Sequence, residues 1–197
     1  MADLPYRKPN RLKGYKYNQN GAYFITICVQ NRINLLGDAV GVGFSVPHKI
    51  RLTEQGKIAE QYVLKIPLIY PNAAVDRYVI MPNHVHILLS IIDLTDCQGS
   101  GTEDARAHDV THTALSAGSI IGWYKHETTK EINSLMDNGI IKIWQRSFHD
   151  HIIRNENDYL KIMEYIDTNP QRWKDDCFFN DVIWDAASFL KQINKQD

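Results

Sequence analysis

The chain has 197 residues, of which 44% are hydrophobic and 23% are charged, and its formal net charge is −1. This length suits one domain with a real core, and the composition is ordinary for a soluble globular protein. No apolar run approaches the ~18 residues that a membrane-spanning helix needs, which argues against a membrane protein. The balanced charge argues against a protein that coats nucleic acid without preference, but it leaves room for a local basic patch.

The cysteines and the N-terminal sequence together indicate where the protein works. Cys28, Cys97 and Cys177 are far apart and form no CxxC pair, which argues against a disulfide framework and against a cysteine-ligated zinc site. The N-terminus contains no apolar signal segment. We therefore expect a cytoplasmic protein with reduced cysteines.

The first 20 residues form a basic arm in which cations alternate with tyrosines. Phosphates attract cations and bases stack on aromatic rings, so such an arm suits single-stranded nucleic acid. A solvated terminus is the alternative interpretation of the same residues. The cations that we consider as DNA contacts are Arg7, Lys8, Arg11 and Lys13.

The remaining sequence predicts strands and helices that mix without a regular βαβ rhythm. This order predicts an α+β protein, with helices covering an antiparallel or mixed sheet. Residues 93–113 are polar and are expected to form a surface loop. The predicted elements are a strand at 22–29, a hairpin within 37–52, a helix at 54–66 stopped by Pro67, strands at 75–81 and 84–92, a helix at about 120–136, extended segments at 141–144 and 148–153, and a helix at 156–168.

Two histidines open the second strand of the predicted hairpin, directly after the Pro82-Asn83 turn. Strand side chains alternate between faces, so His84 and His86 point the same way and Val85 points into the opposite layer. Two imidazoles about 7 Å apart along a strand can converge on one metal ion, and a strand holds them stiffly. Polar residues at the start of an otherwise apolar strand suit a site at an edge of the sheet. The alternative is a pair of hydrogen-bonded histidines with no ligand.

A second pair with the same spacing, His149 and His151, competes for this role. Its intervening residue is Asp150, where the first pair has an apolar one. If this segment is a strand, Asp150 faces the same side as Phe148 and Ile152. We therefore place this pair second and treat His151 as a supporting residue near the site.

The helix predicted at 156–168 carries a tyrosine at the border of its apolar stripe. There the Tyr165 phenol could reach solvent or a substrate. Asn169 follows four residues later, on the same face of the helix, so the phenol and the amide could point at one ion and one phosphate. A boundary tyrosine and an asparagine that closes the helix before Pro170 explain the same residues without any function.

Taken together, these segments resemble the HUH single-strand transposases of the single-tyrosine type, and most of all the REP-associated tyrosine transposases. The resemblance extends from about Arg7 to Trp173 and depends on the shared order and spacing of short motifs. These motifs are RKPNRLKGY from position 7, GAYFITIC from 21, VIMPNHVH from 79, IIG from 120, WQR from 144, HIIR from 151, and EYI from 164 followed by NP at 169.

The resemblance implies a ferredoxin-like sandwich with the two histidines on a central strand. It implies that Tyr165 is the nucleophile and that His84, His86 and Asn169 bind Mg²⁺ or Mn²⁺. Two imidazoles and an amide form a mixed nitrogen and oxygen ligand set, for which Mn²⁺ is at least as suitable as Mg²⁺. The implied reaction is nicking and strand transfer of single-stranded DNA through a 5′-phosphotyrosine.

The expected organisation is a basic arm at 1–20, one catalytic domain at 21–173 and a C-terminal tail at 174–197. The expected partner is single-stranded or hairpin DNA, and the protein is a monomer or a homodimer. Two alternatives remain: a hairpin-binding protein of the same fold with weak catalysis, and a metal-dependent phosphodiester hydrolase. Further DNA-contact candidates in the domain are Lys125, Lys130, Arg146 and Arg154.

Overall fold

The computed structural model describes residues 20–40, 49–92, 116–136 and 141–179. The basic arm up to residue 19, the loop predicted at 93–113 and the tail beyond residue 179 lie outside the described residues, so their predicted roles stay predictions. Within the described part, no helix is both long and apolar enough to cross a membrane.

A four-stranded antiparallel sheet forms the centre of the molecule, with strand order β4-β5-β1-β6. β1 (Gly21–Cys28) pairs with both β5 (His84–Ile91) and β6 (His149–Ile153), and β5 also pairs with β4 (Ala73–Ile80). β1 and β4 therefore run in the same direction with β5 between them, which is the split βαβ arrangement of ferredoxin-like folds. This confirms the predicted α+β class.

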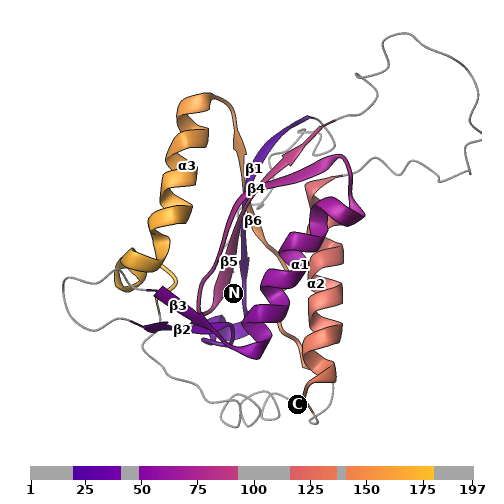
Figure 1. The fold of residues 1–197 in the computed structure, drawn as a ribbon, viewed down its shortest axis with the longest axis vertical. Helices are drawn as coiled ribbons and strands as arrows, with labels where there is room; N and C mark the ends of the chain where they lie inside the picture. The colour runs from indigo at the N-terminus through magenta and orange to yellow at the C-terminus, as the bar shows by residue number, and fades with distance from the viewer. Residues whose placement is uncertain (1–19, 41–48, 93–115, 137–140, 180–197) are drawn as a thin grey trace, which may run out of the picture.

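Helices cover both faces of this sheet. α1 (Glu54–Ile69) and α2 (Ala117–Ser134) pack side by side on one face, and α3 (Glu156–Thr168) lies on the other (Figure 1). A short 3-10 helix, η3 (Asn169–Asp175), continues directly from α3. The α3 face is the one that carries the candidate site.

The main core lies between the sheet and the pair α1 and α2. Alternate residues of β1 and β5 point into it, including Ile25, Ile27, Val85 and Ile87, all of which are fully buried. Burying side chains of this size contributes about 1.5–3 kcal/mol each, so the pleat of these strands is strongly fixed. A slip of one residue would exchange the two faces and carry the histidines into the core.

The segment after β1 clamps the turn that leads into β5. Val29 N donates to Asn83 O at 2.8 Å, and Leu36 N donates to Pro82 O at 2.9 Å. Arg32, within the short helix η1 (Gln30–Arg32), adopts a left-handed φ of 54°, which is uncommon for a residue with a side chain. These contacts fix the backbone on which His84 begins its strand.

The structure extends one predicted element, confirms another and shortens a third. α1 continues to Ile69 with Pro67 in its last turn, because its apolar residues remain in contact with the core through Ile66. The predicted hairpin forms as β2 (Gly37–Val40) and β3 (Lys49–Leu52) in a separate two-stranded sheet. The segment expected to be extended at 141–144 contributes one isolated bridge, from Trp144 to Val29.

Candidate metal centre and tyrosine

The sheet register places His84 and His86 on the face that α3 covers. His84 lies opposite Cys28 and His86 lies opposite Thr26, both on β1. The polar start of this strand suggested a site at an edge of the sheet. β5 is instead an internal strand, so the pair lies at the end of a central strand. Both imidazoles are buried, with 0% and 1% of their surface exposed.

The hydrogen bonds of Asn83 determine the tautomer of His84. The Asn83 side-chain Nδ2 donates to the carbonyl oxygens of Arg32, at 3.2 Å, and of Phe178, at 2.8 Å. This fixes the amide orientation, so the atom that lies 2.9 Å from His84 Nδ1 is Oδ1, which can only accept. His84 must therefore carry its proton on Nδ1, which leaves the lone pair on Nε2.

His86 is held by a hydroxyl and an aromatic ring from β1. Its Nδ1 lies 2.9 Å from Thr26 Oγ1, and because a hydroxyl can donate or accept, this contact suits either tautomer. The Phe24 ring stacks on the imidazole, with centroids 5.0 Å apart and an angle of 29° between the planes. The ring is therefore fixed on one side by a polar contact and on its face by packing.

Both imidazoles are kept neutral by their surroundings. Burial, together with the positive charge of Arg32, lowers the pKa of His84 to about 3. Burial and the neighbouring His84 also lower the pKa of His86 well below its ordinary value, although Asp176 opposes this shift. A neutral imidazole is the form that binds metals.

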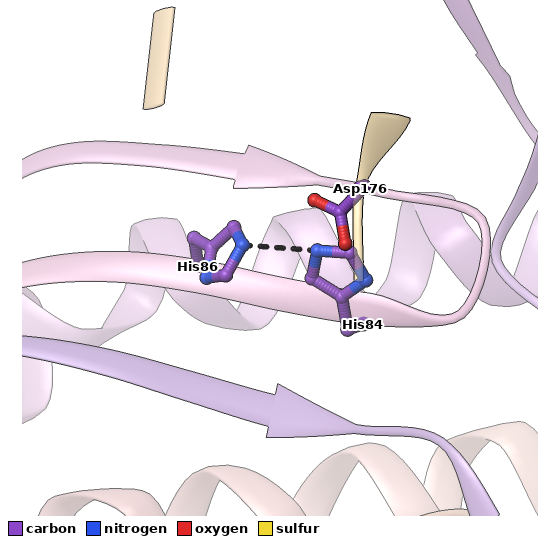
Figure 2. Close-up of side chains that lie close together, drawn as sticks. All are labelled: His84, His86 and Asp176. Atoms are coloured by element: carbon purple, nitrogen blue, oxygen red, sulfur yellow. Dashed lines mark hydrogen bonds between the residues drawn. The ribbon is translucent and has the colours of Figure 1, made fainter. Parts of the chain in front are cut away.

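The two Nε2 atoms, of His84 and His86, lie 3.0 Å apart (Figure 2). Neighbouring ligand atoms around an octahedral cation have about this separation when each is about 2.1 Å from the ion. One carboxylate completes a group, since the ligand atoms of His84, His86 and Asp176 all lie within 4.8 Å of one another. These residues could hold a divalent cation.

α3 brings a phenol and an amide to the same point. The Tyr165 hydroxyl lies 3.4 Å from His86 Nε2, and its ring meets Phe24 edge-on at 5.8 Å between centroids. Asn169, at the end of the helix, is 2% exposed, and its Oδ1 is buried without a hydrogen-bond partner. A buried amide oxygen without a partner beside two imidazole lone pairs fits a metal ligand.

Asp176 was not among the residues predicted from the sequence. It follows η3, and its Oδ2 accepts from Asn169 Nδ2 at 3.1 Å and from the Tyr165 hydroxyl at 3.5 Å. In the sequence it is the second of two adjacent aspartates in what reads as an acidic tail, and no periodicity separates it from Asp175. Only its position soon after the tyrosine helix could have raised it as a candidate.

Residues 176–179 close over the histidine pair. The centroid of the Phe178 ring lies 4.7 Å from that of the His84 ring. The Arg32 guanidinium lies over the Phe178 ring, with its Cζ 5.0 Å from the ring centroid. Arg32 Nη1 also donates to the Cys177 carbonyl at 3.4 Å, and Phe179 packs edge-on against Trp173. These contacts explain why both imidazoles are buried while Tyr165 remains 36% exposed.

The remaining predicted site residues lie outside this group. His151 lies opposite Phe24 and His149 opposite Thr26, so both are on the same face as His86, but both are exposed. Asp150 faces the other way, opposite Ile25, as the strand alternation predicted. The domain cations expected to contact DNA lie elsewhere. Lys125 and Lys130 are on α2, Arg146 precedes β6 and Arg154 follows it.

Comparison with solved structures identifies the fold. A solved structure of a REP-associated tyrosine transposase bound to a REP hairpin superposes with a TM-score of 0.50 and 22% identity, over 86% of this chain and 73% of that one. This likeness establishes the fold. The structure is thus that of a protein with the tyrosine-transposase fold, carrying an HUH-like histidine group at His84 and His86.

One relative has a higher sequence identity to this chain than the solved transposase has. A protein of Haemophilus influenzae, named only as an uncharacterized protein, is 34% identical over 182 residues, which cover 91% of this chain and 97% of the relative. The chain belongs to the same family as this Haemophilus protein. No family model matches the chain.

Proposed function

We propose that this protein nicks and rejoins single-stranded DNA in a metal-dependent reaction in which Tyr165 is the nucleophile. The observation that carries the proposal is the 3.4 Å contact between the Tyr165 hydroxyl and His86 Nε2. It brings a partly exposed phenol from one element against a buried, neutral histidine pair from another.

The residues that would hold the cation are His84, His86 and an oxygen ligand from Asn169 or Asp176. A set of two nitrogens with amide or carboxylate oxygens suits Mn²⁺ and Mg²⁺. When bound there, such a cation would polarise the scissile phosphate and would screen the charge on the leaving oxygen. The tautomer imposed by Asn83 leaves the His84 lone pair directed to the centre.

In the proposed step, Tyr165 Oη attacks the phosphorus of a phosphodiester. A bond between Oη and phosphorus forms, the bond from phosphorus to the 3′ oxygen breaks, and the 3′ oxygen leaves and takes up a proton. The products are a 5′-phosphotyrosine and a free 3′-hydroxyl. Because the covalent bond keeps the energy of the phosphodiester, attack by a 3′-hydroxyl reverses the step without ATP.

The phenol must lose its proton during this attack. Burial, then the nearby Asp176 carboxylate, raises the pKa of Tyr165 to about 12, so the phenol is neutral at pH 7. Asp176 Oδ2, which is 3.5 Å from the hydroxyl, is placed to accept the proton as the bond to phosphorus forms. A bound cation would favour phenolate and lower this barrier.

The substrate that we propose is single-stranded DNA next to a hairpin. The solved transposase with this fold is described as bound to a REP hairpin. An unpaired strand could reach the partly exposed phenol on α3, and its scissile phosphate would then have to enter the group formed by His86, Asn169 and Asp176.

Covalent capture tests the proposal. Wild-type protein and Tyr165→Phe are mixed with labelled single-stranded DNA, including hairpin pools, with Mn²⁺ or with EDTA. Tyr159→Phe is the matched control, because Tyr159 is on the same helix and lies about 1.7 turns before Tyr165. We expect an SDS-resistant adduct that needs metal, persists in Tyr159→Phe and is lost in Tyr165→Phe.

Two other results would replace the proposal. Tight hairpin binding by the wild type without an adduct would make the protein a DNA-hairpin-binding module of the same fold. Metal-dependent cleavage that continues in Tyr165→Phe without an adduct would make it a hydrolase in which water attacks and the tyrosine is structural.

A further inference from the structure

A basic groove lies away from the histidine pair, between α2 and the segment at 142–146. Its volume is about 540 Å³, and among the described residues that line it four are lysine or arginine and none is acidic. The whole chain carries a net charge of −1, so this groove concentrates positive charge locally. The four cations are Lys125, Lys130, Lys142 and Arg146.

Lys125 builds the groove rather than charging its surface. Its Nζ donates to three successive carbonyls, those of Gln145, Arg146 and Ser147, at 2.6, 3.2 and 3.3 Å. A half-buried ammonium bound in this way ties the extended segment to α2. On the floor, the Trp144 indole donates to Thr128 Oγ1 at 2.8 Å, which fixes the same segment from below. The groove therefore has rigid walls.

The other three cations have no ion-pair partner among the residues that the structure describes. Lys130, Lys142 and Arg146 are all exposed. The four ion pairs found in the described ranges involve other side chains, and the carboxylate beside the groove, Glu127, pairs with His126 at 3.0 Å. Three exposed cations from two elements, with no ion-pair partner in the described ranges, thus line one open groove.

The backbone connects this groove to the end of the sheet where the histidines lie. Gln145 N donates to the Cys28 carbonyl at 2.9 Å, and Cys28 is the residue opposite His84. Arg146 is three residues before His149, which begins β6 on the site face. A strand of nucleic acid that leaves the tyrosine across the β6 edge would reach Arg146 first and the groove next.

We propose that this groove binds the sugar-phosphate backbone of the DNA outside the scissile phosphodiester. Three separate, flexible cations along an open groove suit a row of phosphates better than a single small anion, which would need converging donors at one point. The Asn133 amide is already used by Ile141, so base-specific contacts are not provided from that position. The groove would then add affinity without sequence preference.

This inference rests on DNA being the substrate, as in the proposed function. Its test is chosen so that a failure of the groove proposal can be told apart from a failure of the proposed nicking activity. The triple variant Lys130→Gln, Lys142→Gln, Arg146→Gln is compared with a control triple variant that removes the same charge at Arg51, Lys57 and Lys65. Binding of a fluorescein-labelled DNA hairpin of arbitrary sequence is followed by anisotropy between about 50 and 200 mM salt. A second probe is an unpaired strand of the same composition. Circular dichroism melting establishes that both variants fold.

We expect the groove variant to bind the hairpin at least about tenfold more weakly at low salt. The slope of log affinity against log salt should fall by about 2–3, close to one for each lost phosphate contact. The control triple variant should retain most of the hairpin affinity and most of the salt dependence. A loss confined to the hairpin assigns the groove to the duplex stem, and an equal loss with the unpaired strand assigns it to single-stranded backbone.

An unchanged affinity and slope in the groove variant would overturn the inference, even if Tyr165 still forms its adduct. Conversely, a wild-type protein that forms no adduct, but whose DNA affinity depends on the three cations, would keep the groove and reject the nicking activity. A short unpaired oligonucleotide that supports adduct formation should be captured by the groove variant at the wild-type level when it is saturating, because the variant leaves the tyrosine and histidines intact.

Discussion

Two His-x-His pairs lie on the same face of one sheet, and the structure treats them differently. The pair on β5, His84 and His86, is buried and each ring has a specific partner at its Nδ1. The pair on β6, His149 and His151, lies on the edge strand and is exposed. Thr26 is the neighbour of both pairs, since it lies opposite His86 on one side and His149 on the other.

The comparison shows that two histidine pairs with the same spacing can have very different surroundings. Both pairs have the same spacing in the sequence and lie on one face, but only in the β5 pair are both rings buried, with the Nδ1 of each held by a side-chain contact. α3 and residues 176–178 cover the β5 pair and supply the extra oxygen atoms. The predictions below test whether these differences decide which pair binds metal.

Removing a member of the β5 pair should have the largest effect. We expect His86→Ala to weaken Mn²⁺ binding by roughly 100-fold or more and to abolish the DNA adduct, because it removes a ligand and not only its support. The double variant His149→Ala, His151→Ala should change both by about twofold at most, as exposed substitutions usually do. Isothermal titration calorimetry measures the affinity. Equal losses in the two variants would mean that the pairs share one function.

The second largest loss of Mn²⁺ affinity is expected on changing Asn83, the hydrogen-bond partner of His84. Asn83→Ala removes the acceptor that holds the proton on His84 Nδ1, and we expect Mn²⁺ affinity to fall by roughly 10- to 100-fold. Nitrogen chemical shifts of the His84 ring should show the loss of a single tautomer. Asn157→Ala, an exposed asparagine on α3, is the control. If the tautomer stays fixed and affinity is retained, the Asn83 contact does not direct the lone pair.

Burial of the β5 pair should also make the metal-free protein sensitive to acid. Because the pKa of His84 is lowered to about 3, the unfolded chain binds more protons than the folded protein below the ordinary value of 6.5. The free energy of unfolding should therefore fall as the pH falls from about 6.5 towards 3. His84→Gln should flatten this part of the profile in urea titrations. An identical slope in the variant would contradict the neutral, buried His84.

The smallest of the expected effects is a shift in the pKa of Tyr165 on changing Asp176, the site residue that was not predicted from the sequence. Asp176→Asn removes a charge that raises the pKa of Tyr165, so the phenol should ionise at lower pH than in the wild type. Ultraviolet difference titration of the variant, with and without Tyr165→Phe, isolates this phenol. Asp175→Asn, next to it and exposed, should leave the titration unchanged. A shift of equal size in both would show a general charge effect.

Local rules predicted much of the site from the sequence. Strand alternation placed His84 and His86 on one face and Asp150 on the other, and the i, i+4 spacing placed Asn169 beside Tyr165. The structure confirms these placements, while the roles of the residues stay predictions. The types of the longer strands and helices in the described ranges were also predicted correctly, whereas the segment at 141–144 forms one isolated bridge and the two 3-10 helices were not predicted.

The rest depended on tertiary pairing, which no local pattern encodes. That β5 is internal and β6 is an edge decides which histidine pair is buried, and this follows from strand order alone. Asp176 reaches the site only because η3 turns the chain back after α3. Pro67 did not end α1, because contacts of Ile66 with the core outweigh the backbone penalty near the end of a helix.

The position of β1 between β5 and β6 has a consequence for when the protein becomes competent. The contacts at the site join residues that are 60 and 79 positions apart in the chain, from Thr26 to His86 and from His86 to Tyr165. Such non-local pairing slows folding, and domains assemble as they emerge during synthesis from the N-terminus. β1, β4 and β5 can pair early, but β6 and the α3 helix that carries Tyr165 are synthesised later. In a nascent chain the histidine pair can therefore be in place before the Tyr165 phenol reaches it.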